Sequence, residues 1–419
     1  NVVVPDITTM TREALKELGL DNKTVVKCKN MFALGICFWL FDRPEDYARR
    51  YLDNKFAKKN PAVAEANKRA IDAGYNYAAN THQFANHYRV ATASLEKGTY
   101  RTISGNVATA WGLCAAAEKA GLPLFCGSYP ITPATVILEE LAKRKDLGVK
   151  TVQAEDEIAG ICTAIGAAYA GNFAVTTTSG PGLSLKSEAL GLAVMTELPL
   201  VVVDVQRGGP STGLPTKTEQ SDLAQALYGR NGECPVVVMA ASSPSDCFHF
   251  AFEAGRIAME HMTPVILLTD GFIANGSEPW RIPSMKDYPT ICPPIVETAP
   301  EDGFMPYVRN EKMVRGWAFP GKTGLEHRVG GLEKDAVKGS ISTDPDNHQK
   351  MVRARAAKVA LVAEDIPVQQ VLGDEEGDLL VVGWGGTRGH LQNAVDELRS
   401  EGHRVSLCHF NYIHPLPHG

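Results

Sequence analysis

The chain has 419 residues, 44% of them apolar and 21% charged, with a formal net charge of −6 at pH 7. This balance is typical of a globular protein of two to four domains that can bury a sizeable core. The acidic balance disfavours nucleic acid as a partner, because phosphate binding needs a basic face. No apolar run approaches the length of a transmembrane helix, so we expect a cytoplasmic protein without a membrane partner.

Two features of the whole chain bear on its setting. Nine cysteines are present and no two are spaced as C-x-x-C. Such scattered thiols are typical of a reducing compartment, and they disfavour an iron–sulfur cluster held wholly by this chain. The chain does not begin with Met, shows no signal peptide, and stops just after an apolar strand-like run, so we expect a piece of a longer protein.

The pattern divides the chain into four segments. Residues 1–97 contain helical stretches with mixed charge. In residues 98–275, strand-like and helix-like runs alternate, which predicts a doubly wound, mostly parallel α/β sheet. The expected strands are 123–126, 149–153, 173–178, 199–205, 235–241 and 264–269, and the expected helices are 133–144, 158–170, 185–195, 221–227 and 244–261.

The last two segments differ from this pattern. Residues 276–370 have weak periodicity and form an expected irregular connector. Residues 371–419 begin a further, truncated α/β domain. Its Gly383-x-Gly385 turn resembles a dinucleotide fingerprint but has Arg388 where the third Gly would stand, which favours plain packing over NAD binding. His327 and His348 lack ligand spacing, so no metal site is predicted.

Four unusual loops follow strands of the predicted sheet. Ligands of doubly wound sheets lie outside the carboxyl ends of the strands, so these loops form the candidate active site. They are residues 127–133 (Gly-Ser-Tyr-Pro-Ile-Thr-Pro), 153–157 (Gln-Ala-Glu-Asp-Glu), 178–182 (Thr-Ser-Gly-Pro-Gly) and 206–213 (Gln-Arg-Gly-Gly-Pro-Ser-Thr-Gly).

Individual residues in these loops allow two interpretations each. Glu157 starts a helix of small residues, and either caps it or exchanges a proton with a ligand. The turn Ser179-Gly180-Pro181 either is an ordinary tight turn or offers amides to a ligand. Arg207, flanked by glycines, suits carboxylate recognition, although a lone loop arginine is more often a surface residue.

These loops, in this order and spacing, closely resemble the alpha subunit of the 2-oxoacid:ferredoxin oxidoreductases. The likeness covers the whole chain. Residues 1–97 resemble the C-terminal part of the family's gamma-type domain, residues 98–275 its pyrimidine-binding domain, and residues 371–419 the start of a transketolase-C-like domain. The fused gamma-type domain and the connector resemble the 2-oxoglutarate enzymes in particular.

The resemblance implies the chemistry of the site. Thiamin diphosphate would bind with its pyrimidine half on this chain, while a beta subunit would supply Mg²⁺ and a [4Fe–4S] cluster in an (alpha–beta)₂ heterotetramer. CoA would be co-substrate and ferredoxin the electron acceptor. Glu157 would be catalytic and would bind the cofactor together with Ser179, Gly180 and Pro181, and the substrate would be held by Thr132, Arg207, Ser211 and Thr212.

Two alternatives stay open from the sequence. The first is an oxidoreductase for pyruvate or branched-chain 2-oxoacids, because an additional cation for a dicarboxylate cannot be placed. The second is a non-catalytic electron-transfer or scaffold subunit, which the presence of Glu157 argues against.

Overall fold

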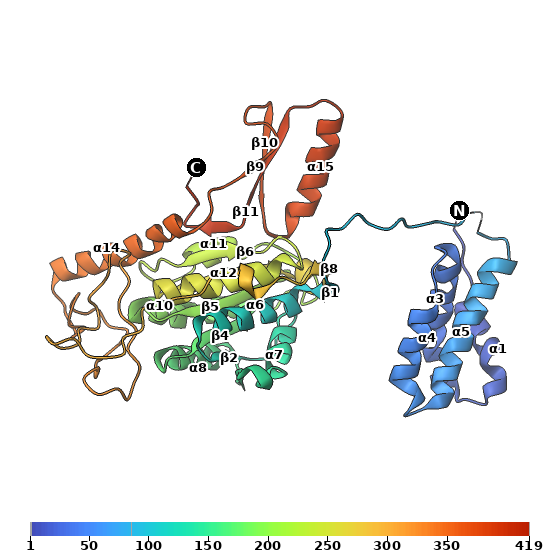
Figure 1. The fold of residues 1–419 in the computed structure, drawn as a ribbon, viewed down its shortest axis with the longest axis horizontal. Coiled ribbons are helices and arrows are strands. Elements are labelled where there is room, and N and C mark those ends of the chain that lie inside the picture. Colours follow the sequence, from blue (N-terminus) through green and yellow to red (C-terminus); the bar gives the residue numbers. More distant parts are fainter. Residues whose placement is uncertain (1, 85, 419) are drawn as a thin grey trace. The chain divides into compact units, whose positions relative to one another are not determined.

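The computed structural model describes residues 2–84 and 86–418, and the chain splits into two compact units, Asn1–Lys97 and Gly98–Gly419. The first unit is helical (Figure 1). In it, α3 and α5 pack backbone to backbone, because a Cβ on Gly35 would lie 2.1 Å from the Ile71 carbonyl oxygen and one on Gly74 would lie 1.9 Å from that of Phe32. Its helices are α1 (Ile7–Leu15), α2 (Asn22–Lys27), α3 (Lys29–Leu40), α4 (Asp46–Leu52) and α5 (Pro61–Asn80).

The second unit is built on a seven-stranded sheet with the order β12-β6-β7-β5-β4-β2-β3. All neighbours in it pair in parallel except β12, which runs antiparallel to β6. The central strands are continuous β-branched and apolar runs that are buried on both faces, as parallel strands require. The strands are β2 (Leu124–Ser128), β3 (Lys150–Gln153), β4 (Phe173–Thr178), β5 (Leu200–Gln206), β6 (Val237–Ala240), β7 (Pro264–Asp270) and β12 (Tyr412–His414).

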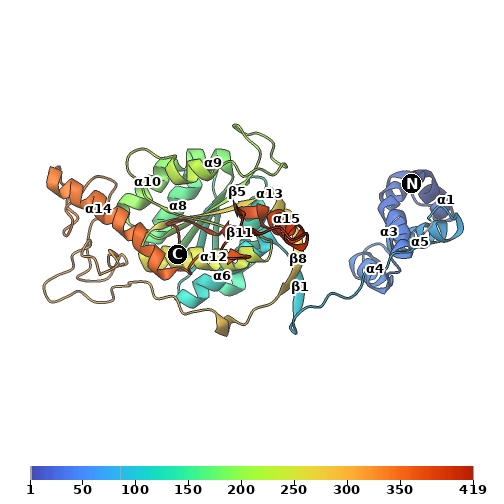
Figure 2. The same ribbon diagram turned by 90° about the horizontal axis from the view of Figure 1, so that it is seen from above.

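Helices cover both faces of this sheet (Figure 2). One apolar core contains residues of α6 (Gly105–Ala120), α7 (Thr135–Ala142) and α12 (Asp246–His261), and the other contains residues of α8 (Glu157–Tyr169), α9 (Gly180–Leu185) and α10 (Ser187–Thr196). The short helices α11 (Leu223–Tyr228) and α13 (Gly271–Asn275) complete this part. The expected doubly wound α/β class is therefore confirmed.

Several elements were not among those expected. Helix α6 and the antiparallel pair of β1 (Tyr100–Ser104) and β8 (Ser277–Arg281) flank the sheet region. The connector contains a helix, α14 (Pro345–Leu361), where the sequence pattern predicted only irregular chain. In the C-terminal segment, where a further α/β unit was expected, β10 (Leu379–Trp384), α15 (Arg388–Ser400) and β11 (Val405–Phe410) are present, and the additional strand β9 (Val371–Leu372) completes a three-stranded sheet in the order β10-β11-β9.

A buried ionic cluster attaches the connector and α14 to the sheet region. Glu197, only 1% exposed after the end of α10, accepts hydrogen bonds from Arg309 of the connector and Lys358 of α14. Arg315, also buried, donates to the carbonyl oxygen of Thr196, 3.1 Å away. Burial by itself would raise the pKa of Glu197, but the charges of Lys358 and Arg309 outweigh it and lower the pKa to about 2. The carboxylate therefore stays ionised and neutralises buried cations.

We predict that Glu197→Gln destabilises the second unit by about 3–5 kcal/mol at pH 7, since it leaves buried cations without a counter-charge. The pKa of Glu197 is lowered in the folded chain, so its contribution to the free energy of unfolding is fully present above the pKa of an unfolded glutamate. This contribution is lost as the pH falls towards 2. The variant's deficit in urea denaturation should therefore shrink from pH 7 to pH 3.

The matched control is Glu297→Gln. Glu297 also pairs with a lysine, Lys322, but its side chain is 72% exposed. Surface pairs contribute about 0–1 kcal/mol, so this variant should be close to the parent in stability. Equal losses in the two variants would contradict the role given to the buried cluster.

Candidate functional site

The loops at the carboxyl ends of the strands enclose a cavity of about 720 Å³. Six of the residues predicted for the site line it: Glu157, Gly180, Pro181, Arg207, Ser211 and Thr212. Ser179 and Thr132 are not among its lining residues, although both lie in the same loops. The other lining residues are Ile131, Ser184, Leu185, Gly209, Pro210, Glu219, Ser221, Asp222 and Gln225.

Glu157 is the first residue of α8, but it does not cap the helix. The N-cap is Asp156, whose Oδ1 accepts a hydrogen bond from the amide of Ala159 at 2.8 Å. Asp156 therefore takes the capping role that Glu157 could otherwise have had. The Glu157 carboxylate instead hydrogen-bonds the hydroxyl of Tyr129, and it lines the cavity.

Tyr129 connects Glu157 to the next strand. Its hydroxyl lies 3.0 Å from Oγ1 of Thr178 at the end of β4. Burial, followed by the hydrogen bond to the Glu157 carboxylate, raises the pKa of Tyr129, so the phenol keeps its proton and serves as a donor. The sequence analysis gave this residue no role, although it lies inside the first of the four loops.

The close packing of Tyr129, Glu157 and Thr178 explains why residue 182 is a glycine. A Cβ on Gly182 would lie 2.1 Å from Thr178 Oγ1, 2.2 Å from the Tyr129 hydroxyl and 2.9 Å from Cγ of Glu157. No real Cβ fits at such distances, so the hydrogen-bonded group formed by Tyr129, Glu157 and Thr178 requires a glycine beside it.

Arg207 joins two of the loops from within. It is 7% exposed; its Nη1 donates to the carbonyl oxygen of Thr132 at 2.7 Å and its Nη2 to that of Thr212 at 2.9 Å. Its Nε, also buried, has no partner among the described residues. The side chain therefore holds the backbone of both loops and keeps unused N–H donors beside the cavity.

A pair of carboxyl groups lies behind the cavity wall. Asp204 of β5 is fully buried and contacts Asp222, which lines the cavity. Burial, and then the charge of Asp222, raise the pKa of Asp204 well above its usual value. Burial also raises the pKa of Asp222, an effect that the neighbouring Asp204 opposes. Because both pKa values are raised, the pair carries less negative charge than its composition suggests.

Three residues at the candidate site were given no role from the sequence: Tyr129, Asp204 and Asp222. Two signals were available, since Tyr129 lies inside the first of the four loops and Asp204 is a charged residue inside the apolar run of β5. Asp222 gave no signal, because its role depends on a tertiary contact with Asp204.

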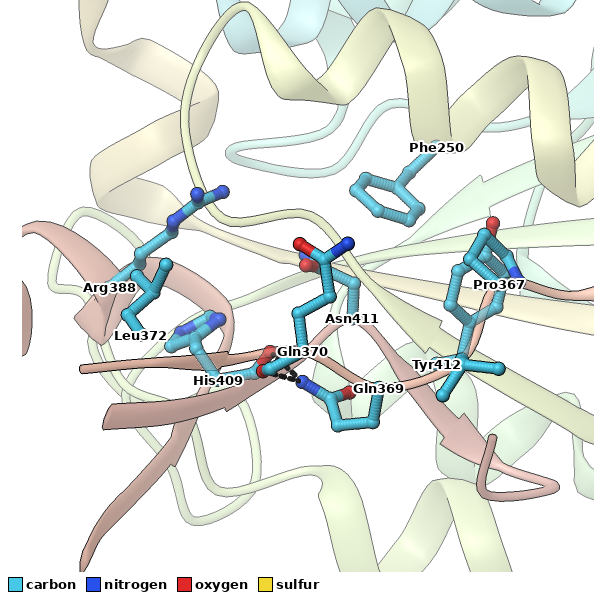
Figure 3. A pocket seen from close by; sticks show the side chains of 10 residues that line it. Phe250, Pro367, Gln369, Gln370, Leu372, Arg388, His409, Asn411 and Tyr412 are labelled. Atoms are coloured by element: carbon cyan, nitrogen blue, oxygen red, sulfur yellow. Dashed lines mark hydrogen bonds between the residues drawn. The ribbon is translucent and has the colours of Figure 1, made fainter. Parts of the chain in front are cut away.

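Other parts of the second unit are less suited to chemistry. A cavity of about 290 Å³ lies between α12 and the segment around β9 and β11, with Phe250, Gln370, Arg388, His409 and Asn411 among its lining residues (Figure 3). Burial lowers the pKa of His409 to about 4, so this imidazole is neutral at pH 7. Within residues 2–84 and 86–418, no group of three or more His, Cys, Asp or Glu side chains is placed to hold a metal ion, and no helix could span a membrane.

Known proteins resemble the chain along most of its length. The family model described as pyruvate flavodoxin/ferredoxin oxidoreductase, thiamine diphosphate-binding, matches residues 116–343, and a second, described as pyruvate ferredoxin/flavodoxin oxidoreductase, matches residues 1–77.

Among curated relatives, the 2-oxoglutarate oxidoreductase subunit KorA of Mycobacterium tuberculosis is 53% identical over 98% of the chain, which spans 62% of that relative's length. The 2-oxoglutarate synthase subunit KorA of Methanothermobacter marburgensis is 36% identical over 75% of the chain and 82% of its own length.

A solved structure agrees with these relatives. It is 2-oxoglutarate:ferredoxin oxidoreductase from Magnetococcus marinus with 2-oxoglutarate, coenzyme A and succinyl-CoA bound, at a TM-score of 0.87 and 35% identity, covering 97% of this chain and 69% of that one. The family resemblance inferred from the four loops is confirmed. The chain belongs to the pyruvate ferredoxin/flavodoxin oxidoreductase family and contains its thiamine diphosphate-binding domain.

Proposed function

We propose that the chain is the alpha-type part of a 2-oxoglutarate:ferredoxin oxidoreductase. The reaction would convert 2-oxoglutarate and CoA to succinyl-CoA and CO₂, with two electrons passing to ferredoxin. The observation that carries the proposal is a cavity lined by both Glu157 and Arg207. Glu157 is not used as a helix cap, and Arg207 bridges two of the loops. The names of the relatives and the ligands bound in the Magnetococcus enzyme support the choice of substrate.

The residues of the site fit the pyrimidine half of thiamin diphosphate. A Cβ on Gly180 would lie 2.6 Å from Oδ1 of Asp222, so a glycine is required at this point of the cavity wall because the Asp222 carboxylate packs against it. Ser179 is fully buried and its Oγ has no partner among the described residues. With Pro181 and Glu157, these groups would hold the aminopyrimidine. Thiamin diphosphate, when bound, supplies the nucleophilic carbon that attacks the 2-oxo group.

Glu157 would act on a proton at the pyrimidine ring nitrogen. Its carboxylate receives the Tyr129 hydrogen bond on one side, which leaves its remaining lone pairs for a ligand in the cavity. Asp156 already caps the helix, so Glu157 can change protonation state without leaving the amides of the first turn unsatisfied. A proton relay of this kind typically contributes ~10²–10⁴-fold to rate.

Arg207 would pair with the C1 carboxylate of the substrate through its unused N–H groups, beside Thr132, Ser211 and Thr212. It is the one basic side chain among the described residues lining the cavity. A cation for the second carboxylate of 2-oxoglutarate would therefore come from the beta subunit. The half-neutral Asp204–Asp222 pair would keep repulsion of an anionic substrate low.

The remaining components would come from partners. We expect a beta subunit to supply Mg²⁺ and a [4Fe–4S] cluster in an (alpha–beta)₂ heterotetramer, with ferredoxin as acceptor. The gamma-type and transketolase-C-like assignments of residues 1–97 and 371–419 are part of the same proposal. The assembled enzyme, assayed with CoA and a viologen dye on several 2-oxoacids, should favour 2-oxoglutarate; a preference for pyruvate or branched-chain 2-oxoacids would overturn the substrate assignment.

In the assembled enzyme, Glu157→Gln should lower kcat by at least ~10²-fold, equal to about 2.7 kcal/mol of barrier, because the amide cannot exchange the proton. The melting temperature and KM for the 2-oxoacid should change little, since Asp156 still caps α8. Stopped-flow viologen reduction and thermal unfolding measure the two effects.

Two neighbours serve as controls for Glu157. Asp156→Ala removes the cap and should cost about 0.5–2 kcal/mol of stability, a loss that Glu157→Gln should not show. Glu155→Gln changes an exposed carboxylate two residues earlier and should keep parental activity. If Glu155→Gln abolished turnover while Glu157→Gln retained it, the catalytic carboxylate would have been assigned wrongly.

Arg207→Lys should lower kcat/KM for the 2-oxoacid by about 10- to 100-fold, since one ammonium cannot hold the carbonyls of Thr132 and Thr212 and also face a carboxylate; hydrogen bonds to charged groups contribute about 1.5–3 kcal/mol each. Hydrogen exchange should increase in residues 208–217. The control is Arg230→Lys, because Arg230 also donates to backbone carbonyls, those of Ala226 and Leu227, but lies outside the cavity lining. Equal kinetic losses in both variants would contradict a site-specific role for Arg207.

A further inference from the structure

A lysine lies fully buried behind the candidate site. Lys186 connects α9 to α10 and has 0% exposure. Among the residues that the structure describes, no carboxylate forms an ion pair with its ammonium. Burial lowers the pKa of Lys186 to about 8, against the opposing effect of the Glu157 charge. A buried ammonium is costly unless its hydrogen bonds and charge are used, so its contacts indicate its role.

The ammonium reaches the residue proposed to be catalytic. Nζ donates to the carbonyl oxygen of Glu157 at 2.7 Å and to Oγ1 of Thr176 at 3.1 Å. It also lies 5.1 Å from the centre of the Tyr129 ring, within the range of a cation–π interaction. Tyr129 in turn hydrogen-bonds the Glu157 carboxylate. Lys186 thus contacts the backbone of Glu157 directly. It also contacts Tyr129, which is the partner of the Glu157 side chain.

We propose that Lys186 is a positioning residue of the active site: its buried ammonium fixes the first turn of α8 and the ring of Tyr129, and in this way holds the Glu157 side chain in place at the cavity. The inference rests on the proposed role of Glu157. Lys186 touches neither substrate nor cofactor in this account, because it does not line the cavity.

Several ionisable groups near Lys186 affect its pKa. The groups that act on it are Glu157, Asp156 and Cys162 of the α8 segment, and Cys126 of β2. Burial raises the pKa of Cys126 to about 12, so this thiol is neutral at physiological pH. Asp156 is exposed and hydrogen-bonded to the Ala159 amide. Among these groups, Glu157 is the one whose backbone carbonyl oxygen accepts a hydrogen bond from Lys186 Nζ.

The test uses the assembled enzyme and Lys186→Met, which keeps the length and apolar stem of the side chain and removes its charge. Losing the charge-assisted hydrogen bond to the Glu157 carbonyl should let the first turn of α8 shift, and a misplaced catalytic group lowers the rate more than it lowers substrate affinity. We therefore expect kcat to fall by about tenfold or more, while KM for the 2-oxoacid changes by less than about threefold. Calorimetric binding of thiamin diphosphate should also weaken, and this readout is independent of turnover.

The chain contains a matched control in Lys334. It is 2% exposed, has a pKa lowered by burial to about 8, donates to the Met195 carbonyl oxygen at 2.9 Å and lies 5.4 Å from the Tyr307 ring centre. Lys334→Met should lower stability as Lys186→Met does, while leaving kcat and the binding of thiamin diphosphate at parental values. An equal loss of kcat in Lys334→Met would show a general effect of losing a buried lysine and would overturn the proposal.

Two further variants separate the possible failures. Lys186→Gln keeps a donor for the Glu157 carbonyl but lacks the charge that faces the Tyr129 ring, so it should recover only part of the lost kcat, and it serves as the test if Lys186→Met fails to assemble. A parental kcat in Lys186→Gln, together with an inactive Glu157→Gln, would overturn the role of Lys186 alone. A fully active Glu157→Gln would overturn the proposed function itself.

Discussion

The buried guanidinium of Arg207 is the constraint on which the candidate site depends. It binds the backbone of the Thr132 loop on one side and that of the Thr212 loop on the other, so neither loop can move without breaking a charge-assisted hydrogen bond. Glu219 adds to this from outside, accepting from the amide of Gly209 at 2.7 Å. A loop segment rich in glycine and proline is thereby held in one conformation around the cavity.

The electrostatics of the site follow from burial as much as from composition. Tyr129 keeps its proton because burial and the Glu157 carboxylate raise its pKa, and the Asp204–Asp222 pair retains a proton for the same two kinds of reason. Lys186 is the opposite case, a cation whose pKa falls when it is buried. The site therefore contains several ionisable groups whose environments push their pKa values apart, as acid–base chemistry near neutral pH requires.

The connector is attached to the sheet region by charge as well as by apolar packing, since Ile291, Val314 and Trp317 belong to the main apolar core. Glu197 meets Arg309 and Lys358, which follow it by 112 and 161 residues. Because these partners come from segments so distant, the cluster can form only when the sheet region has folded. The chain between residues 288 and 344, in which no helix or strand is assigned, is in this way held against the α/β core.

The sequence by itself determined the fold class and the edge of the sheet where the site lies. Apolar runs such as β5 and β7 are long enough to predict buried parallel strands, and polar loops that follow such strands must meet at one edge. It also brought Glu157 and Arg207 forward, because Glu157 begins a helix of small residues and Arg207 follows a strand and precedes two glycines. These are local properties of short segments, which periodicity and residue type report directly.

Only the tertiary structure decided how these residues are used. Whether Glu157 caps its helix depended on where Asp156 pointed, and whether Arg207 is free depended on two carbonyl groups from separate loops. The same holds for Lys186, whose position after an exposed leucine gave no sign that its ammonium reaches another helix. Contacts across long sequence separations fix burial, and burial fixes which groups keep a proton; neither can be read from a run of neighbouring residues.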